Sequence, residues 1–395
     1  MVLRQAVRGL RSRLRFFRRG QAATWVATTV LVAAVGLPLL SIWRSPAQHP
    51  VLNFNPAHSA TQTPTSAPST PTPTPKPSAT PRPSPTAARS AAPAPTVRPS
   101  VSAAGSPVKI LFGLGPQIQS ASTYRLTREA PIHILSAWYN GPGDLSWITD
   151  SYHRSVYRQQ YAAGRSLHLI VWTDAPNATI ATKYGTACGR PYPLSDRFLG
   201  DIGHLAQAFA GSGRLYVTLF TEFQTYACTE NAWDPDPQTM AYWRALEDRY
   251  LAAMAVIKKN APKALVSLGW GGWQTRWDEP AIGGGRSMIP HFADVMRASD
   301  FQSFQSMRSD SNVSDIASMV NVLGAYGPVM LAHYKPVDAS QAVYDADVQT
   351  LLTDSYMTRL RNGGLFAWCF MDTHNLTAST ATYAFVKAAV QRYGL

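Results

Sequence analysis

Eight short apolar runs alternate with helical stretches between residues 108 and 395. Strands that are buried on both faces of a parallel sheet read as nearly continuous apolar runs, and helices form the crossovers between them. Eight such units in about 288 residues have the pattern and size of a (β/α)8 TIM barrel, so we predict an α/β fold of this type. The predicted strands cover residues 109–115, 132–139, 167–174, 215–224, 264–270, 301–307, 329–334 and 365–372.

A doubly wound open sheet is the main alternative for alternating strands and helices. Its dinucleotide-binding form carries Gly-x-Gly-x-x-Gly after the first strand. Here Gly113-Leu114-Gly115 is too short for that motif and is followed by Pro116. The absence of the motif favours the barrel.

A basic segment and then a long uncharged segment open the chain. Residues 1–21 carry seven arginines and no acidic residue, and residues 22–43 carry no charge. Twenty-two residues at about 1.5 Å each can span a hydrocarbon core of about 30 Å, and flanking arginines favour the cytoplasmic side. We predict a cytoplasmic segment (1–21) and a single transmembrane signal anchor (22–43), with the C-terminal domain extracellular. The alternative is a long signal peptide that is cleaved after Ala47, which would release a secreted protein.

Residues 44–107 are rich in Pro, Thr, Ser and Ala and poor in apolar residues, so we predict a disordered linker. Twelve of the 36 Lys and Arg residues lie in residues 1–107, together with no Asp or Glu. Subtracting these 12 from the formal net charge of +13 leaves about +1 for residues 108–395. This balance gives the globular part no electrostatic basis for binding nucleic acid.

Three cysteines fit an extracellular compartment if two of them pair. Cys188 and Cys228 follow consecutive predicted strands, so we expect a disulfide across the mouth of the barrel. Cys369 lies inside an apolar strand, which indicates a buried free thiol. The spacing of Cys and His does not resemble a zinc site, and we expect no metal or cofactor.

The C-terminal ends of the strands of a TIM barrel form one site. Glu222 ends the fourth predicted strand, and Asp174 and Asp372 end the third and the eighth. Sugars have apolar faces edged by hydroxyl groups, so flat rings for stacking together with polar side chains indicate a carbohydrate site; any single tryptophan could instead fill the barrel core. The predicted sugar-binding residues are Trp138, Trp172, Trp270, Trp273, Gln305, His333, Tyr334 and Trp368.

Residues 215–224, with Asn231-Ala232-Trp233 and the helix that carries Tyr242-Trp243-Arg244, resemble the fourth strand and helix of glycoside hydrolase family 26. That family comprises the β-mannanase-like enzymes of the clan A barrels. The resemblance extends to residues 266–270 and 299–305 and to a tryptophan in the eighth strand. It implies that Glu222 is the acid/base and that Trp368 lies under the central sugar.

Two residues depart from the pattern of the family. Thr221 stands where a histidine precedes the acid/base, and His333 stands where the seventh strand should end on the nucleophilic glutamate. A retaining glycosidase needs two carboxyl groups about 5 to 5.5 Å apart, and an inverting one about 6.5 to 9.5 Å. Three explanations follow: Asp372 or Asp174 supplies the second carboxyl, the register of strand seven differs, or hydrolysis has been lost and His333 only binds sugar.

We therefore expect a monomeric extracellular glycoside hydrolase that cleaves a polysaccharide or oligosaccharide, either mannan-like or another β-glycan. Glu222 would act as the general acid and an aspartate as its partner. The alternative is a catalytically inactive, carbohydrate-binding pseudoenzyme displayed at the cell surface.

Overall fold

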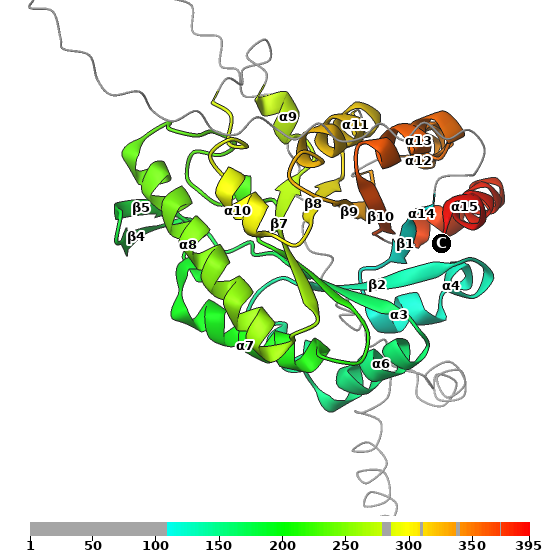
Figure 1. Ribbon diagram of the computed structural model, residues 1–395, viewed down its shortest axis with the longest axis horizontal. Coiled ribbons are helices and arrows are strands. Elements are labelled where there is room, and N and C mark those ends of the chain that lie inside the picture. The colour runs from blue at the N-terminus through cyan, green and yellow to red at the C-terminus, as the bar shows by residue number, and fades with distance from the viewer. Residues whose placement is uncertain (1–108, 279–285, 309–310, 337–339, 372) are drawn as a thin grey trace, which may run out of the picture. The chain divides into compact units, whose positions relative to one another are not determined.

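The computed structural model describes residues 109–278, 286–308, 311–336, 340–371 and 373–395. Eight parallel strands pair in chain order, and the last pairs with the first, which closes a barrel and confirms the predicted (β/α)8 fold (Figure 1). The barrel strands are β1 (Leu111–Leu114), β2 (Ile132–Tyr139), β3 (Ser166–Val171), β6 (Leu215–Leu219), β7 (Ala264–Gly271), β8 (Gln302–Ser306), β9 (Val329–Tyr334) and β10 (Leu365–Phe370).

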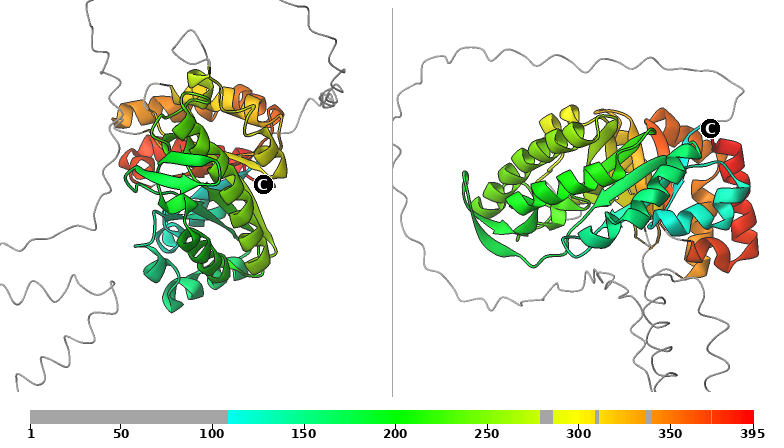
Figure 2. Two further views of the ribbon diagram at one scale, coloured as in Figure 1. Left: turned by 90° about the vertical axis from the view of Figure 1, so that its left-hand side faces the viewer. Right: turned by 90° about the horizontal axis from the view of Figure 1, so that it is seen from below.

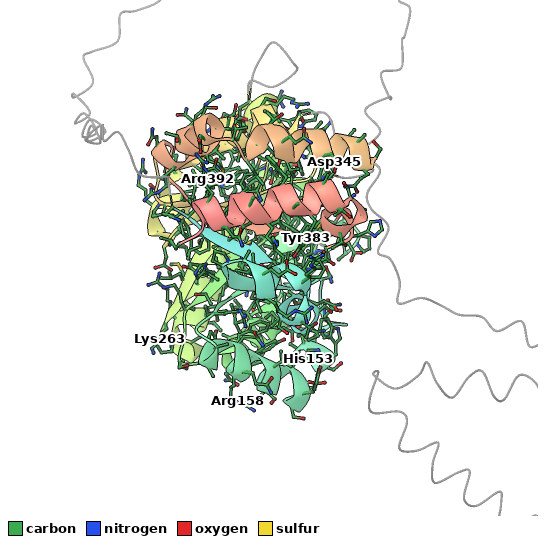
Figure 3. The ribbon with its side chains drawn as sticks, turned by 90° about the vertical axis from the view of Figure 1, so that its right-hand side faces the viewer. His153, Arg158, Lys263, Asp345, Tyr383 and Arg392 are labelled. Atoms are coloured by element: carbon green, nitrogen blue, oxygen red, sulfur yellow. A yellow bond between two sulfur atoms is a disulfide. The ribbon has the colours of Figure 1, made fainter. Side chains whose placement is uncertain are left out.

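Helices cover the outside of the barrel in all views (Figures 1 and 2). Figure 3 shows this outer layer from the side of α12 and α15, which carry the labelled residues Asp345, Tyr383 and Arg392. The helices are α3 (Ile118–Thr123), α4 (Arg125–Glu129), α5 (Leu145–Ile148), α6 (Ser151–Ala162), α7 (Asp196–Phe209), α8 (Pro237–Asn260), α9 (Gln274–Trp277), α10 (Ala293–Ala298), α11 (Asn312–Leu323), α12 (Gln341–Leu351), α13 (Asp354–Asn362), α14 (His374–Ala378) and α15 (Thr380–Tyr393).

Helix α8 begins at Pro237, directly after its N-cap residue Asp236. The Asp236 carboxylate accepts hydrogen bonds from the backbone N–H and the hydroxyl of Thr239, and Pro237 occupies the first helical position. These contacts satisfy donors that a helix start leaves unpaired. The buried face of α8 includes Trp243, and it packs against the barrel wall.

Two features differ from the prediction. The fourth barrel strand ends at Leu219, because Phe220 has a φ of 56° and leaves the extended conformation. An antiparallel hairpin of β4 (Ala178–Thr182) and β5 (Gly185–Gly189) follows β3, in a region predicted to be loop. In Figure 1 this hairpin lies beside α8 at the edge of the domain.

The barrel interior contains a layer of hydrogen-bonded polar side chains, which we call the interior seam: Ser136, His168, Thr218, Ser267 and Ser303. His168 contacts the Ser136 hydroxyl through Nδ1 at 3.3 Å and the Thr218 hydroxyl through Nε2 at 2.9 Å. Ser303 Oγ accepts from Thr218 at 3.1 Å and from Ser267 at 3.0 Å. Five strands are thus linked through one buried network.

The interior seam keeps its histidine neutral. His168 is fully buried, and burial lowers its pKa to about 3. Desolvation disfavours the charged imidazolium, whereas the two hydroxyl partners satisfy the neutral ring.

The segments predicted at 1–21, 22–43 and 44–107 lie outside the described residues. Within the described part of the chain, the structure contains no helix that is both long enough and apolar enough to cross a membrane.

Candidate active site

Five predicted site residues meet at the C-terminal end of the barrel, and we call them the barrel-end cluster: Trp138, Trp172, Glu222, Gln305 and His333. The Trp138 ring lies 4.6 Å from the His333 ring and 6.4 Å from the Trp172 ring, centroid to centroid. The Gln305 side chain donates a hydrogen bond to the Glu222 carboxylate. Gln305 and His333 are each 2% exposed, whereas the other three keep part of their surface in solvent.

The backbone around Glu222 is held in an uncommon conformation. Phe220 and Glu222 have φ values of 56° and 57°, in the left-handed region that few non-glycine residues adopt. The Glu222 carbonyl accepts hydrogen bonds from the backbone N–H of Thr225 at 2.9 Å and from its hydroxyl at 2.8 Å. Such strain persists where the surrounding structure enforces it, which is common at functional sites.

Hydrogen bonds to the next strand brace the loop that follows Glu222. The Gln224 side chain donates to the Gly271 carbonyl at 3.2 Å and accepts from the Gly271 N–H at 3.1 Å. The Asn231 N–H donates to the Gln224 carbonyl at 2.8 Å, and its side chain accepts from the Trp273 indole at 2.9 Å. A side chain at Gly271 would collide with the Trp273 ring, 2.6 Å from a Cβ there. Trp273 therefore lies over the end of β7, next to the loop that carries the acid.

A disulfide fastens the β4–β5 hairpin to the same loop. Cys188 and Cys228 are bonded, with their Cα atoms 5.4 Å apart. The Cys228 N–H donates to the Cys188 carbonyl at 3.1 Å, and the Arg190 N–H donates to the Tyr226 carbonyl at 2.9 Å. The Arg190 guanidinium lies 4.5 Å from the centroid of the Tyr226 ring and donates to the Thr173 carbonyl at the end of β3. The hairpin thus places a buried cation beside the barrel-end cluster.

The Glu222 carboxyl occurs in both its protonated and its ionised form near neutral pH. Burial raises its pKa to about 7, the Gln305 hydrogen bond and the Arg190 charge lower it, and the Glu230 charge raises it. Glu222 keeps some exposed surface as a residue, but its carboxyl is enclosed, and desolvation dominates. A carboxyl group that is half protonated near neutral pH suits a general acid.

Arg190 and Glu230 lie near the site, although neither was predicted from the sequence. Burial raises the pKa of Glu230, and the charge of Arg190 offsets part of this rise. The Glu230 side chain is exposed as a whole, which limits this shift. Arg190 and Glu230 each follow a bonded cysteine by two residues, and this spacing was the available sequence signal.

The other predicted carboxylates do not join the described cluster. Asp174 is exposed, and the charges that act on the Glu222 carboxyl come instead from Arg190 and Glu230. Asp372 lies outside the described residues.

His333, the residue before the end of β9, is a neutral, buried side chain. Burial, with smaller contributions from His168 and Lys335, holds its pKa well below the ordinary value. Neither ring nitrogen has a hydrogen-bond partner among the described residues. The seventh barrel strand therefore ends without a negative charge at this position.

Several further polar atoms of the site are buried without a partner in the described part of the chain. They are the indole nitrogens of Trp138 and Trp172, Gln305 Oε1 and Thr221 Oγ1. Buried polar atoms in folded proteins nearly always have a partner. The barrel-end cluster thus offers both donors and acceptors to a ligand.

Three residues predicted to bind sugar lie elsewhere, which corrects the expectation for Trp270, Tyr334 and Trp368. All three are buried in the main apolar cluster between the strands and helices. The ring centroids of Trp270 and Phe292 are 5.9 Å apart, and those of Trp368 and Tyr334 are 5.1 Å apart. Side chains alternate between the two faces of a strand, so a residue near a strand end can point outward.

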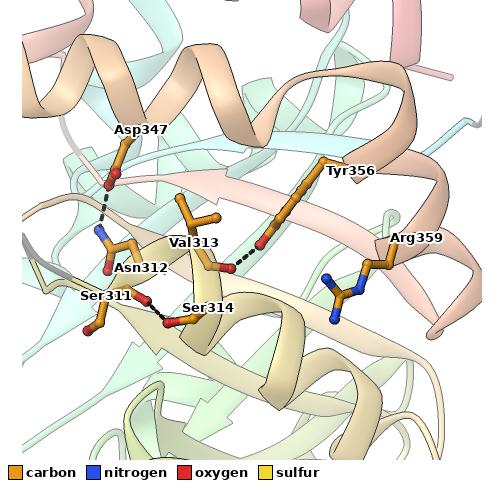
Figure 4. Close-up of a pocket in the computed structure, with 7 residues that line it drawn as sticks. All are labelled: Ser311, Asn312, Val313, Ser314, Asp347, Tyr356 and Arg359. Atoms are coloured by element: carbon orange, nitrogen blue, oxygen red, sulfur yellow. Dashed lines mark hydrogen bonds between the residues drawn. The ribbon is translucent and has the colours of Figure 1, made fainter.

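A cavity of about 400 Å³ lies among α11, α12 and α13, outside the barrel-end cluster (Figure 4). Asp347 in its wall accepts hydrogen bonds from Asn312 at 3.0 Å and from the Tyr334 hydroxyl at 3.4 Å. The second contact holds Tyr334 toward the helices. The cavity is lined by Ser311, Asn312, Val313, Ser314, Asp347, Tyr356 and Arg359.

Among the residues that the structure describes, no three His, Cys, Asp or Glu side chains are grouped to hold a metal ion.

No family model matches the chain, and no curated protein does, so membership of family 26 stays an expectation. Several solved structures with a similar fold are glycoside hydrolases. A β-galactosidase from Bacillus circulans sp. alkalophilus has a TM-score of 0.47 at 10% identity, over 72% of this chain and 55% of that one. A β-1,4-mannanase from the sea hare Aplysia kurodai has a TM-score of 0.41 at 13% identity, over 72% and 92%.

A psychrophilic family 10 endo-β-1,4-xylanase has a TM-score of 0.43 at 10% identity, over 73% of this chain and 97% of that one. Likenesses at this level do not decide the function of the chain.

Proposed function

We propose that this protein is a glycoside hydrolase in which Glu222 is the general acid. The observation that carries the proposal is the state of the Glu222 carboxyl, whose pKa burial raises to about 7 at the C-terminal end of a barrel strand. The indole rings of Trp138 and Trp172 beside it would stack on a sugar. The resemblance of residues 215–224 to the acid/base strand of family 26 supports the same role.

In this mechanism the protonated Glu222 carboxyl gives its proton to the glycosidic oxygen as the bond to the anomeric carbon breaks. The resulting carboxylate then accepts a proton from the attacking water in a retaining mechanism, whereas a second carboxylate does so in an inverting one. Glu230, Asp174 and Asp372 are the candidates for the second carboxyl. Of the two that the structure describes, Glu230 is the one whose charge acts on the Glu222 carboxyl.

We propose a polysaccharide substrate, mannan-like or another β-glycan, and an extracellular monomer that residues 22–43 hold at the membrane or that is secreted after cleavage. The disulfide between Cys188 and Cys228 supports an oxidising compartment. The apolar and basic pattern of residues 1–43 supports the membrane anchor.

A second candidate function is carbohydrate binding without hydrolysis. The neutral His333 favours it, because it stands where the resemblance implies a nucleophilic glutamate. A site of this kind would keep the stacking rings and hydrogen bonds of the barrel-end cluster but lack the charge that stabilises an oxocarbenium-like transition state.

Release of reducing ends from mannan, xylan, β-1,4-glucan and chitin oligomers tests the two candidates. Glu222→Gln should lower kcat by a factor on the order of 100 to 10,000 while oligosaccharide affinity, measured by calorimetry, is kept. Glu247→Gln on α8 is the matched control, since burial also raises the Glu247 pKa to about 7 but the residue lies in the outer helical layer.

Full turnover by the Glu222 variant would remove Glu222 from the mechanism. Binding of an oligosaccharide by the wild-type protein, with no turnover of any glycan, would establish the binding function instead.

A further inference from the structure

We propose that the substrate is a β-glycoside of a 2-acetamido-2-deoxy sugar, whose own acetamido oxygen acts as the nucleophile on the side of the neutral His333. The inference rests on the proposed function, because it assigns Glu222 the same role as general acid. It deepens that function by naming the substrate class and the nucleophile.

The charges around Glu222 favour a nucleophile that the substrate supplies. Among the described residues at this end of the barrel, Glu222 carries the enclosed carboxyl, while Glu230 and Asp174 are exposed. Glu230 also belongs to the same braced loop as Glu222, whereas a nucleophile must approach the anomeric carbon from the face opposite the acid. His333, on a different strand, is neutral and buried. A substrate that brings its own nucleophile needs no carboxylate there.

The unpartnered polar atoms of the barrel-end cluster match an acetamido group. An acetamido group has one N–H donor, one carbonyl acceptor and an apolar methyl group. Gln305 donates through its amide nitrogen to Glu222, and its Oε1 is buried without a partner among the described residues, so it can accept the acetamido N–H. The unpartnered indole N–H groups of Trp138 and Trp172 are donors, and their rings provide an apolar surface for the methyl group. The cluster is therefore complementary to each part of the acetamido group.

Water is the only reactant that this hydrolysis needs besides the glycoside. The acetamido oxygen gives a lone pair to the anomeric carbon and closes an oxazolinium ring, while the bond to the leaving oxygen breaks. That oxygen keeps the bonding electrons and takes the proton of Glu222. Water then adds to the same carbon and gives a proton to the Glu222 carboxylate, and the ring opens to restore the acetamido group. The product is the hydrolysed sugar with the anomeric configuration retained.

Two matched substrates test the inference. Chitotetraose and cellotetraose share their linkage and ring configuration and differ in the acetamido groups. We expect kcat/KM for chitotetraose to exceed that for cellotetraose by at least about a thousand-fold, because a positioned intramolecular nucleophile is worth that much or more. The thiazoline derived from N-acetylglucosamine, a stable analogue of the oxazolinium, should bind at least about a hundred-fold more tightly than N-acetylglucosamine.

A pair of variants locates the acetamido site. Gln305→Met removes the acceptor and should weaken binding of N-acetylglucosamine about ten-fold or more, since it leaves the acetamido N–H buried and unpaired. Gln302→Met is the control, because Gln302 lies on the same strand and also has a buried Oε1 with no described partner but bonds Met296 outside the cluster. It should leave N-acetylglucosamine binding unchanged.

Equal hydrolysis of the two tetrasaccharides, or no binding of the thiazoline by a protein that hydrolyses other glycans, would overturn the inference and leave the proposed function standing. Covalent capture of Glu230 or Asp372 by a 2-deoxy-2-fluoro glycoside would do the same. No hydrolysis of any glycan would overturn the proposed function and this inference with it.

Discussion

Replacing Glu222 with glutamine should stabilise the folded protein at alkaline pH. The pKa of this carboxyl rises from 4.5 to about 7 on folding. Between these values the folded protein binds a proton that the unfolded chain does not, so raising the pH removes stability. At 1.36 kcal/mol per pKa unit, the loss approaches about 3 kcal/mol above pH 7. The amide of the Glu222→Gln variant has no proton to lose and avoids this cost.

Urea denaturation of the wild type and the Glu222→Gln variant between pH 4 and pH 9 measures the effect. The difference in free energy of unfolding should be close to zero at pH 4 and should reach about 3 kcal/mol in favour of the variant at pH 8. Glu247→Gln should follow the same trend without loss of turnover, because burial raises the Glu247 pKa to about 7 as well. A Glu222→Gln gain that does not change with pH, or no gain at pH 8, would refute the assignment of a desolvated carboxyl.

Three further predictions concern the frame of the site. Replacing Cys188 and Cys228 with alanine should lower the free energy of unfolding by about 4 kcal/mol, because the disulfide closes a loop of 40 residues, and calorimetry would measure this loss. The same replacement should loosen Arg190 and thereby shift the alkaline limb of the pH–rate profile. The pKa of His168 is about 3 in the folded protein and 6.5 in the unfolded chain. The free energy of unfolding should therefore fall by up to about 1.4 kcal/mol per pH unit as the pH drops from 6.5 toward 3. His168→Gln should flatten this pH dependence in urea titrations. Asp236→Ala should destabilise α8 by about 1 kcal/mol in the same titrations, and an unchanged midpoint would contradict its role as N-cap.

The strands could be predicted because a short run of apolar residues indicates a buried strand. All eight barrel strands lie where the sequence places them, and β2 and β9 match to the residue. The β4–β5 hairpin escaped prediction because its residues are small or polar and mostly exposed, so they carry no burial signal. The prediction extended the strand before Glu222 too far, since the turn to positive φ at Phe220 occurs within an apolar sequence.

The site was harder to predict than the fold, because strand position does not give side-chain direction. A strand buried on both faces has no polar side to fix its alternation. Irregular pairing adds to the difficulty: β9 has one extra residue opposite β8 between Leu331 and His333, which turns His333 inward and Tyr334 outward. Arg190 and Glu230 lie near the site because the disulfide between Cys188 and Cys228 holds their two segments together. The pattern of a single strand or helix does not predict such a contact.

The interior seam also selects how the strands can align during folding. If one of its strands slid by a single residue, its hydroxyl or imidazole would face the apolar layer under the helices, and the partners left behind would lose their hydrogen bonds. Each buried group left unsatisfied costs about 1 to 3 kcal/mol. An interior of aliphatic residues alone would tolerate such slippage more readily. The polar groups at the centre of the barrel therefore penalise misaligned closures and favour the single pairing that sets Glu222 opposite Gln305.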